Sequence, residues 1–139
     1  MAIRFHEKDA AKQKFLRRKI KKWIEGEILR KGKNPGEINI IFTSDDSVRV
    51  LNREYLKKNY YTDILSFDYS KEFTINGDLF ISVERVNENA INYHTRYEQE
   101  LFRVIIHGIL HLLGFDDKTE KDKIEMRNEE DKCLERLNF

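Results

Sequence analysis

The sequence is poor in cysteine, proline and uninterrupted apolar stretches, and two of these shortages exclude a class of protein. One cysteine, Cys133, in 139 residues excludes an internal disulfide framework and fits a reducing compartment, so we expect a cytoplasmic protein. We interpret Cys133 as a small buried side chain on a final helix rather than as a catalytic thiol. No apolar run approaches the roughly 20 residues that span a bilayer, and residues 1–10 lack the apolar core of a secretion signal. We therefore expect no membrane partner and a single domain over residues 1–139.

An excess of charge of one sign is also missing from the whole chain, although not from its parts. The formal net charge is +1 at pH 7, with 37% of residues charged. Residues 12–33 hold ten Lys and Arg against two Glu, whereas residues 116–135 hold nine Asp and Glu against five Lys and Arg. Two interpretations stay open: a basic surface on one side of the domain, or an ordinary solvated helix face.

What the chain does carry is a pair of histidines at helical spacing. His107 and His111 are four residues apart, which places both imidazoles on one face of a helix. There they can both reach one metal ion at about 2.0–2.1 Å. Gly114 predicts a left-handed helix stop, after which the chain can return a third ligand. Asp117 lies ten residues after His107, where the third ligand of H-E-x-x-H-x-x-G-x-x-H sites falls, and Asp116 is the alternative.

This match to the metal motif is partial. Gly108 stands where metalloproteases carry the Glu that acts as general base, which argues against a peptidase. A carboxylate in place of a third His remains a legitimate zinc ligand at about 2.0–2.2 Å. The residues around the histidines are apolar nearly all round, which predicts a buried helix, and two buried imidazoles need polar partners. We therefore predict one divalent metal, with zinc preferred and iron, nickel and manganese as alternatives.

The periodicity of apolar residues predicts an α+β fold, in which helices pack on a small sheet. Alternating and β-branched segments predict strands over residues 2–5, 37–43, 63–69 and 78–83. Helical spacing predicts helices over residues 9–31, from the cap cluster at 44–47 to residue 58, and over 84–93, 97–113 and 119–137. Residues 31–36, with the single proline, predict a turn, and residues 71–76 predict a loop with a turn at Asn76–Gly77.

Three blocks of sequence resemble one known family. The stretch HGILHLLGFDD, from His107 to Asp117, resembles the H-G-x-L-H-L-x-G-[YF]-D-H signature of the YbeY family of bacterial endoribonucleases. The residues Leu51-Asn52-x-x-Tyr55 and Thr62-Asp63-Ile64-Leu65-Ser66-Phe67 resemble its L-N-x-x-[YF] and P-T-D-V-L-S-F block. The residues Gly77-Asp78-Leu79-Phe80-Ile81-Ser82 resemble its G-D-I-x-I-S block. The blocks occur in the order and spacing of the family, and the resemblance covers about residues 36–137.

The resemblance carries expectations for fold and function. It implies a mixed sheet of about four strands with the metal helix in the core, packed with about five helices. It also implies a metal-dependent endoribonuclease in ribosomal RNA maturation, including processing of the 3′ end of 16S rRNA, and in ribosome quality control. The implied partners are ribosomal RNA or the small ribosomal subunit, together with ribosome-assembly proteins.

One departure from the family concerns the group that neutralises the phosphate. The signature has an Arg directly after the Tyr of its first block, and that position is Leu56 here. Lys57 and Lys58 could supply positive charge without the bidentate fork of Arg, and Arg53 is a further substrate-binding candidate. The alternative is that these side chains only cover a helix end. Beyond a metal-bound water, the only catalytic candidates are the same two residues, Lys57 and Lys58.

Two other functions compete with the nuclease hypothesis. The basic segment 12–33 and the absence of an Arg at position 56 fit a non-catalytic ribosome-assembly factor that binds RNA or a partner protein. The metal constellation by itself also fits a metal hydrolase that acts on another phosphoester or on an amide.

Overall fold

The computed structural model describes residues 2–58 and 61–137. This part of the chain forms a sheet of four strands and five helices, as predicted. The strands are β1 (Ala2–Glu7), β2 (Asn34–Thr43), β3 (Ile64–Asp68) and β4 (Thr74–Ser82). The helices are α1 (Arg17–Arg30), α2 (Asp45–Leu56), α3 (Val83–Asn92), α4 (Tyr97–Leu112) and α5 (Glu120–Leu137). In this part of the chain, no helix is both long and apolar enough to cross a bilayer.

The sheet is mixed, with the strand order β1-β2-β4-β3. Strand β2 runs parallel to both β1 and β4, whereas β3 runs antiparallel to β4. The parallel pairs arise because a helix lies between β1 and β2, and because α2 and β3 lie between β2 and β4. Strand β3 is last in the strand order and is therefore an edge strand. It lies next to α4, the predicted metal helix.

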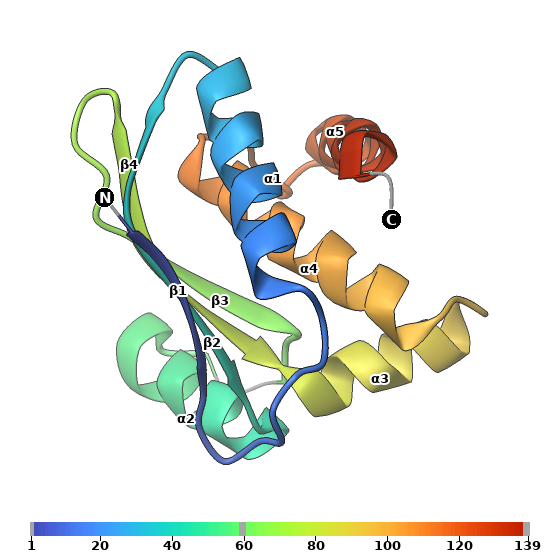
Figure 1. Ribbon diagram of the computed structural model, residues 1–139. Coiled ribbons are helices and arrows are strands. Elements are labelled where there is room, and N and C mark those ends of the chain that lie inside the picture. Colours follow the sequence, from blue (N-terminus) through green and yellow to red (C-terminus); the bar gives the residue numbers. More distant parts are fainter. Residues whose placement is uncertain (1, 59–60, 138–139) are drawn as a thin grey trace.

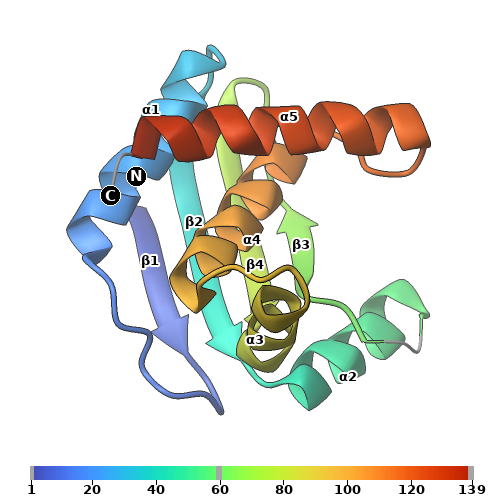
Figure 2. The ribbon, with the colours of Figure 1, turned by 90° about the vertical axis from the view of Figure 1, so that its right-hand side faces the viewer.

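The helices divide between the two faces of the sheet (Figure 1). Helices α1, α3 and α4 lie over one face, while α2 lies over the other. Figure 2 shows α5 crossing the outer side of α1 and α4, so that α4 is enclosed between the sheet and α5. The indole Nε1–H of Trp23 in α1 donates to the backbone carbonyl of Cys133 in α5 at 2.8 Å, which joins these two helices.

The core follows the periodicities on which the prediction relied. Alternate residues of β2 are fully buried, as Ile38, Ile40 and Phe42 show. Helix α4 buries apolar residues almost all round, and Ile105 and Ile109 have no exposed surface. Burying an aliphatic or aromatic side chain of this size stabilises a fold by about 1.5–3 kcal/mol. The helix that carries the two histidines is therefore a central and well-fixed part of the structure.

The first helix is shorter than predicted. It begins at Arg17 rather than at residue 9, and Leu16, an apolar residue inside the predicted helix, is 74% exposed. Tertiary contacts hold the preceding segment in an irregular path. The backbone N–H of Gln13 donates to the Glu7 carboxylate at 3.1 Å, and the ring of Phe15 packs edge-on against Phe102. These contacts with β1 and α4 outweigh the local helix propensity.

The turn predicted at Asn76–Gly77 is wrong, because both residues lie inside strand β4. The chain reverses earlier, where an isolated bridge pairs Lys71 with Thr74. Gly77 does not form a turn but allows neighbouring elements to pack closely against β4. An added Cβ would lie 2.7 Å from the carbonyl oxygen of Phe67 and 2.8 Å from the Leu112 side chain. Strand β2 likewise begins earlier than predicted, at Asn34, and has an irregular register between Pro35 and Ile38.

Candidate metal centre

The centre is built on the last two turns of α4 and on the loop that follows. The helix ends at Leu112, and Gly114 adopts a φ of 102°, which is the left-handed stop predicted from the sequence. The backbone N–H of Gly114 donates to the carbonyl of His111, and that of Phe115 to the carbonyl of Leu110, both at 3.0 Å. These bonds turn the chain back toward the helix and bring the next residues over it.

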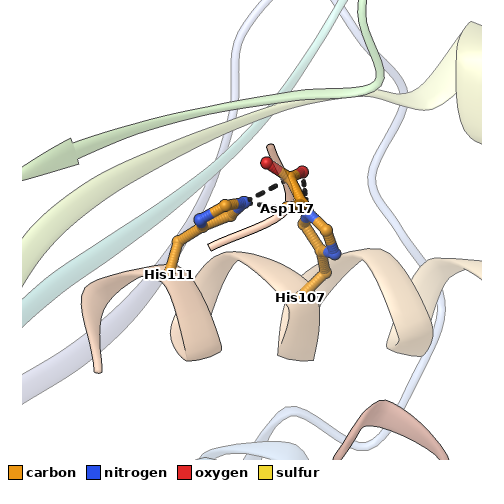
Figure 3. Close-up of side chains that lie close together, drawn as sticks. All are labelled: His107, His111 and Asp117. Atoms are coloured by element: carbon orange, nitrogen blue, oxygen red, sulfur yellow. Dashed lines mark hydrogen bonds and ion pairs between the residues drawn. The ribbon is translucent and has the colours of Figure 1, made fainter. Parts of the chain in front are cut away.

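Three side chains converge where the chain turns back (Figure 3). The Nε2 atoms of His107 and His111 lie 3.0 Å apart. The Oδ2 atom of Asp117 lies 3.4 Å from the first of these nitrogens and 3.3 Å from the second. The imidazole side chains are mostly covered, with 22% and 26% of their surface exposed, whereas the Asp117 side chain is 45% exposed. The group is therefore fixed at its base and open on one side.

This triangle fits a metal ion. An ion with tetrahedral bonds of about 2.0–2.1 Å keeps its ligand atoms about 3.3–3.4 Å apart. The observed sides of 3.0, 3.3 and 3.4 Å are close to that spacing. Two imidazole nitrogens and one carboxylate oxygen are also a donor set that suits zinc. Three ligands leave a fourth position for water or substrate, which is typical of catalytic rather than structural zinc sites.

The far side of the His107 ring is held by a buried carboxylate from α5. Its Nδ1 atom lies 2.6 Å from Oε2 of Glu130, a residue that is only 4% exposed. The other oxygen of Glu130 accepts a bond from Nη1 of Arg103 at 2.8 Å. Burial disfavours the imidazolium, but the bond to Glu130 and its negative charge outweigh this effect and raise the pKa of His107.

The position of Gly108 explains why no glutamate follows His107. A Cβ at this position would lie 2.6 Å from Cδ1 of Ile64 and 2.9 Å from Cδ1 of Leu79. Helix α4 thus presses directly on β3 and β4 here, and a larger side chain has no room. The general base of metalloproteases is therefore sterically excluded at this position.

Two surface depressions share the lining residues Asp63, His107 and Asp117. One has a volume of about 320 Å³ and includes Glu130 and Arg127 in its wall. The other has a volume of about 450 Å³ and lies between α4 and the edge strand β3. His107 and Asp117 are thus accessible to a substrate from both depressions, and His111 from the larger one.

Asp63 is a carboxylate of these depressions that was not predicted as a site residue. It precedes β3, and the amide of Asn89 donates to its Oδ2 at 3.1 Å. Burial raises the pKa of Asp63 above its ordinary value, although the nearby His107 and the bond from Asn89 oppose the shift. The available signal was its place in the T-D-I-L-S-F block, which the sequence comparison noted without giving this residue a role.

Comparison with known proteins identifies the family. The family model described as "Endoribonuclease YbeY" matches residues 2–138. The chain belongs to the YbeY family. A YbeY endoribonuclease of Porphyromonas gingivalis W83 is 46% identical over 132 residues, which is 95% of this chain and 87% of the relative. One of Parabacteroides distasonis is 42% identical over 134 residues, or 96% and 94% of the two chains. The solution structure of a Thermotoga maritima protein has a TM-score of 0.68 at 30% identity, covering 98% of this chain and 89% of that one.

Because the chain belongs to the YbeY family, Asp117 can be compared with the residue at the same position of the family signature, which is a third histidine. Asp117 supplies the oxygen that completes the triangle with the two imidazoles. The adjacent Asp116 lines the larger depression. Of the two carboxylates that the sequence left open, the structure therefore brings Asp117 to the donor triangle. The aspartate at this position preserves a three-donor geometry.

The cations predicted from the sequence lie apart from the triangle. Leu56, at the position of the Arg in the YbeY signature, does line the larger depression beside the histidines. Arg53, Lys57 and Lys58 are exposed on and after the last turn of α2. Lys57 adopts a left-handed φ of 59°, and its Nζ lies 3.4 Å from the carbonyl of Glu54. In the described lining of that depression the basic side chain is Lys118, from the loop after α4, and no motif in the sequence had singled out this residue.

Proposed function

We propose that this chain is a metal-dependent endoribonuclease of ribosomal RNA maturation, with one zinc ion held by His107, His111 and Asp117. The observation that carries the proposal is the triangle of donor atoms at 3.0, 3.3 and 3.4 Å in a YbeY-family fold. Its cellular setting would be the cytoplasm, where the small ribosomal subunit and its assembly factors are the partners implied by the family. The 3′ end of 16S rRNA is the proposed site of action, with ribosome quality control as the wider role.

A zinc ion at this site would lower the pKa of a coordinated water and polarise a phosphoryl oxygen. The protein itself must then accept a proton and neutralise the phosphate. Asp63 lines both depressions with two of the three proposed ligands, so its carboxylate is the group that we propose as proton acceptor. Gly108 excludes a glutamate from the position that metalloproteases use.

Positive charge for the phosphate comes from residues around the two depressions. Lys118 lines the larger one, and Lys123 and Arg127 line the smaller one. Because lysine acts as a point charge, Lys118 can approach a phosphate without the bidentate geometry that an Arg at position 56 would give. Arg53, Lys57 and Lys58 stay proposed as outer contacts, where they would bind RNA beyond the scissile phosphate.

The test is cleavage of an RNA fragment that spans the precursor 3′ end of 16S rRNA. Zinc-loaded wild-type protein should cut it, and His111→Ala should retain no zinc and leave the RNA at the buffer background. His94→Ala is the matched control, because His94 is exposed and lies before α4, outside the triangle. An intact RNA with wild-type protein in zinc, manganese and nickel, or full cleavage by His111→Ala, would contradict the proposal.

A second candidate function has its own support. Leu56 replaces the arginine of the signature inside the depression, and basic side chains such as Lys14, Arg18 and Lys22 are exposed on and before α1. A non-catalytic assembly factor would use this basic surface to bind RNA. It requires that His111→Ala binds RNA and supports rRNA processing in cells as well as the wild type does. The cellular processing assay therefore separates it from the nuclease.

A further inference from the structure

The two carboxylate oxygens of Glu130 contact two different side chains, one oxygen for each partner. Glu130 comes from the middle of α5 and is 4% exposed. Its Oε1 lies 2.8 Å from Nη1 of Arg103, and its Oε2 lies 2.6 Å from Nδ1 of His107. Arg103 also binds Asp131 at 2.7 Å, so the guanidinium spans two neighbouring carboxylates of the same helix. This arrangement places Glu130 directly behind the proposed ligand.

The chemistry of these partners fixes where the proton of a neutral His107 lies. Arginine only donates hydrogen bonds and stays charged in proteins. Glu130 therefore accepts from Arg103 with one oxygen, and as a carboxylate it can only accept with the other. The proton of a neutral His107 must then lie on Nδ1, which leaves the lone pair on Nε2. That nitrogen is the atom 3.4 Å from Asp117 Oδ2 and 3.0 Å from His111 Nε2.

We propose that Glu130 is a positioning residue of the metal centre, which fixes the tautomer and the ring orientation of His107 so that Nε2 is presented to the ion. This inference rests on the metal site of the proposed function. A carboxylate behind a ligating imidazole is a recurrent device for making the nitrogen a better ligand. Glu130 is not part of the donor triangle, and it acts through His107. Arg103 holds the carboxylate in place from the opposite side.

The sharpest variant is Glu130→Gln, which changes shape very little. Because Arg103 only donates, the amide oxygen should turn to Arg103 and the amide NH₂ should face Nδ1 of His107. Nδ1 must then accept, so the ring proton moves to Nε2 and blocks the lone pair needed for the ion. Loss of such an outer partner weakens metal affinity by about 10–100-fold. We expect that change in the zinc dissociation constant, measured by competition with a chelating dye.

A matched control exists where α1 meets the last turn of α5. Glu27 is equally buried, at 3% exposed, and its carboxylate pairs with Arg136. Glu27→Gln therefore makes the same acid-to-amide change in a buried ion pair that holds no histidine. Its zinc dissociation constant should match that of the wild type within about twofold, since changes at distant sites act independently. Equal weakening in both variants would mean that Glu130 acts only through general stability, and would overturn the proposal.

A second measurement does not depend on any variant folding. Long-range ¹H–¹⁵N correlation spectra of metal-free wild-type protein, in buffer alkaline enough for a neutral ring, report which nitrogen of His107 carries the proton. A protonated Nδ1 supports the proposal, and a protonated Nε2 overturns it. If the wild type binds no zinc, the proposed metal function fails, yet the tautomer spectrum still decides whether Glu130 sets the ring. Unchanged zinc affinity in a folded Glu130→Gln would overturn the positioning role alone.

Discussion

Two buried glutamates form ion pairs with arginines at helix α5, and the two pairs differ in how many carboxylate oxygens the arginine occupies. In its last turn, Arg136 meets Glu27 of α1 through Nε and Nη2, at 2.8 and 2.7 Å from the two carboxylate oxygens. In its middle, Glu130 meets Arg103 of α4 through one oxygen alone, at 2.8 Å. The first pair is a closed fork, in which the arginine uses both oxygens. The second pair leaves one oxygen for His107 at 2.6 Å.

The contrast between the two pairs shows how a structural ion pair becomes part of a functional site. A closed bidentate pair satisfies its carboxylate and fixes two helices against each other. An open pair holds the carboxylate through one oxygen and keeps the other oxygen for a third group. Burial is nearly the same in both cases, with Glu27 at 3% and Glu130 at 4% exposed. The number of oxygens that the arginine occupies therefore separates the two functions better than burial does.

The largest expected effect comes from extending this comparison to Asp63, a carboxylate held by the neutral amide of Asn89 instead of an arginine. Asp63→Asn should lower the rate of RNA cleavage by about 10²–10⁴-fold, because the variant cannot accept a proton. Zinc content and thermal stability should stay close to wild type. Single-turnover cleavage, with zinc determined on the same sample, measures both. Retention of full rate would remove Asp63 from the chemistry and leave the proton acceptor unidentified.

The next largest effect is expected on the free energy of unfolding, when the closed Glu27–Arg136 pair is broken. Glu27→Gln leaves Arg136 with a neutral partner, and breaking a buried pair costs about 3–5 kcal/mol when the remaining charge stays buried. The Arg136 side chain is 30% exposed and can be hydrated, so we expect a smaller loss, about 2 kcal/mol in the free energy of unfolding. Urea denaturation of metal-free protein measures it. A variant as stable as the wild type would show that this fork contributes little to holding α1 on α5.

The outcome at these sites shows what the sequence could and could not supply. The convergence of the proposed ligands was predictable because their spacing is local: His111 lies four positions after His107, and a glycine stop precedes Asp117. Gly114 adopts the left-handed conformation that this prediction required. The sheet and the five helices were likewise predictable from apolar periodicity. The positions that failed, such as Phe15 and Gly77, are those whose conformation depends on contacts with distant residues.

The groups around the ligands were not predicted for the same reason. Asp63, Arg103 and Glu130 come from the loop before β3, from α4 and from α5, and only the packing of these elements brings them together. A signal for one of them was present. Arg103 lies four residues before His107 in the stretch 101–110, which is apolar apart from these two residues, so the two share a face and need polar partners there. That face could have been predicted to meet an acidic helix, although not which glutamate of α5.

The smallest expected effect is chemical and concerns the thiol beside the closed pair. Cys133 is fully buried, and its burial, together with the negative charge of Glu27, raises its pKa to about 12. The folded pKa lies above the unfolded value, so this thiol adds stability that is fully present below about pH 9 and is lost as the pH rises toward 12. Since the thiolate is the reactive form, a disulfide reagent near pH 8 should modify Cys133 far more slowly in folded than in urea-unfolded protein.

The reaction rate of the Cys133 thiol distinguishes the Glu27–Arg136 pair from the Glu130–Arg103 pair. Glu27→Gln removes the charge next to Cys133, whose Sγ lies 3.3 Å from Glu27 Oε1, so the thiol should react faster than in the wild type. Glu130→Gln changes a carboxylate three residues away along the same helix, but one whose bonds go to α4. It should leave the reaction rate near that of the wild type. Equal acceleration in both variants would mean that α5 opens as one unit, and that the open and closed pairs differ in geometry but not in what they stabilise.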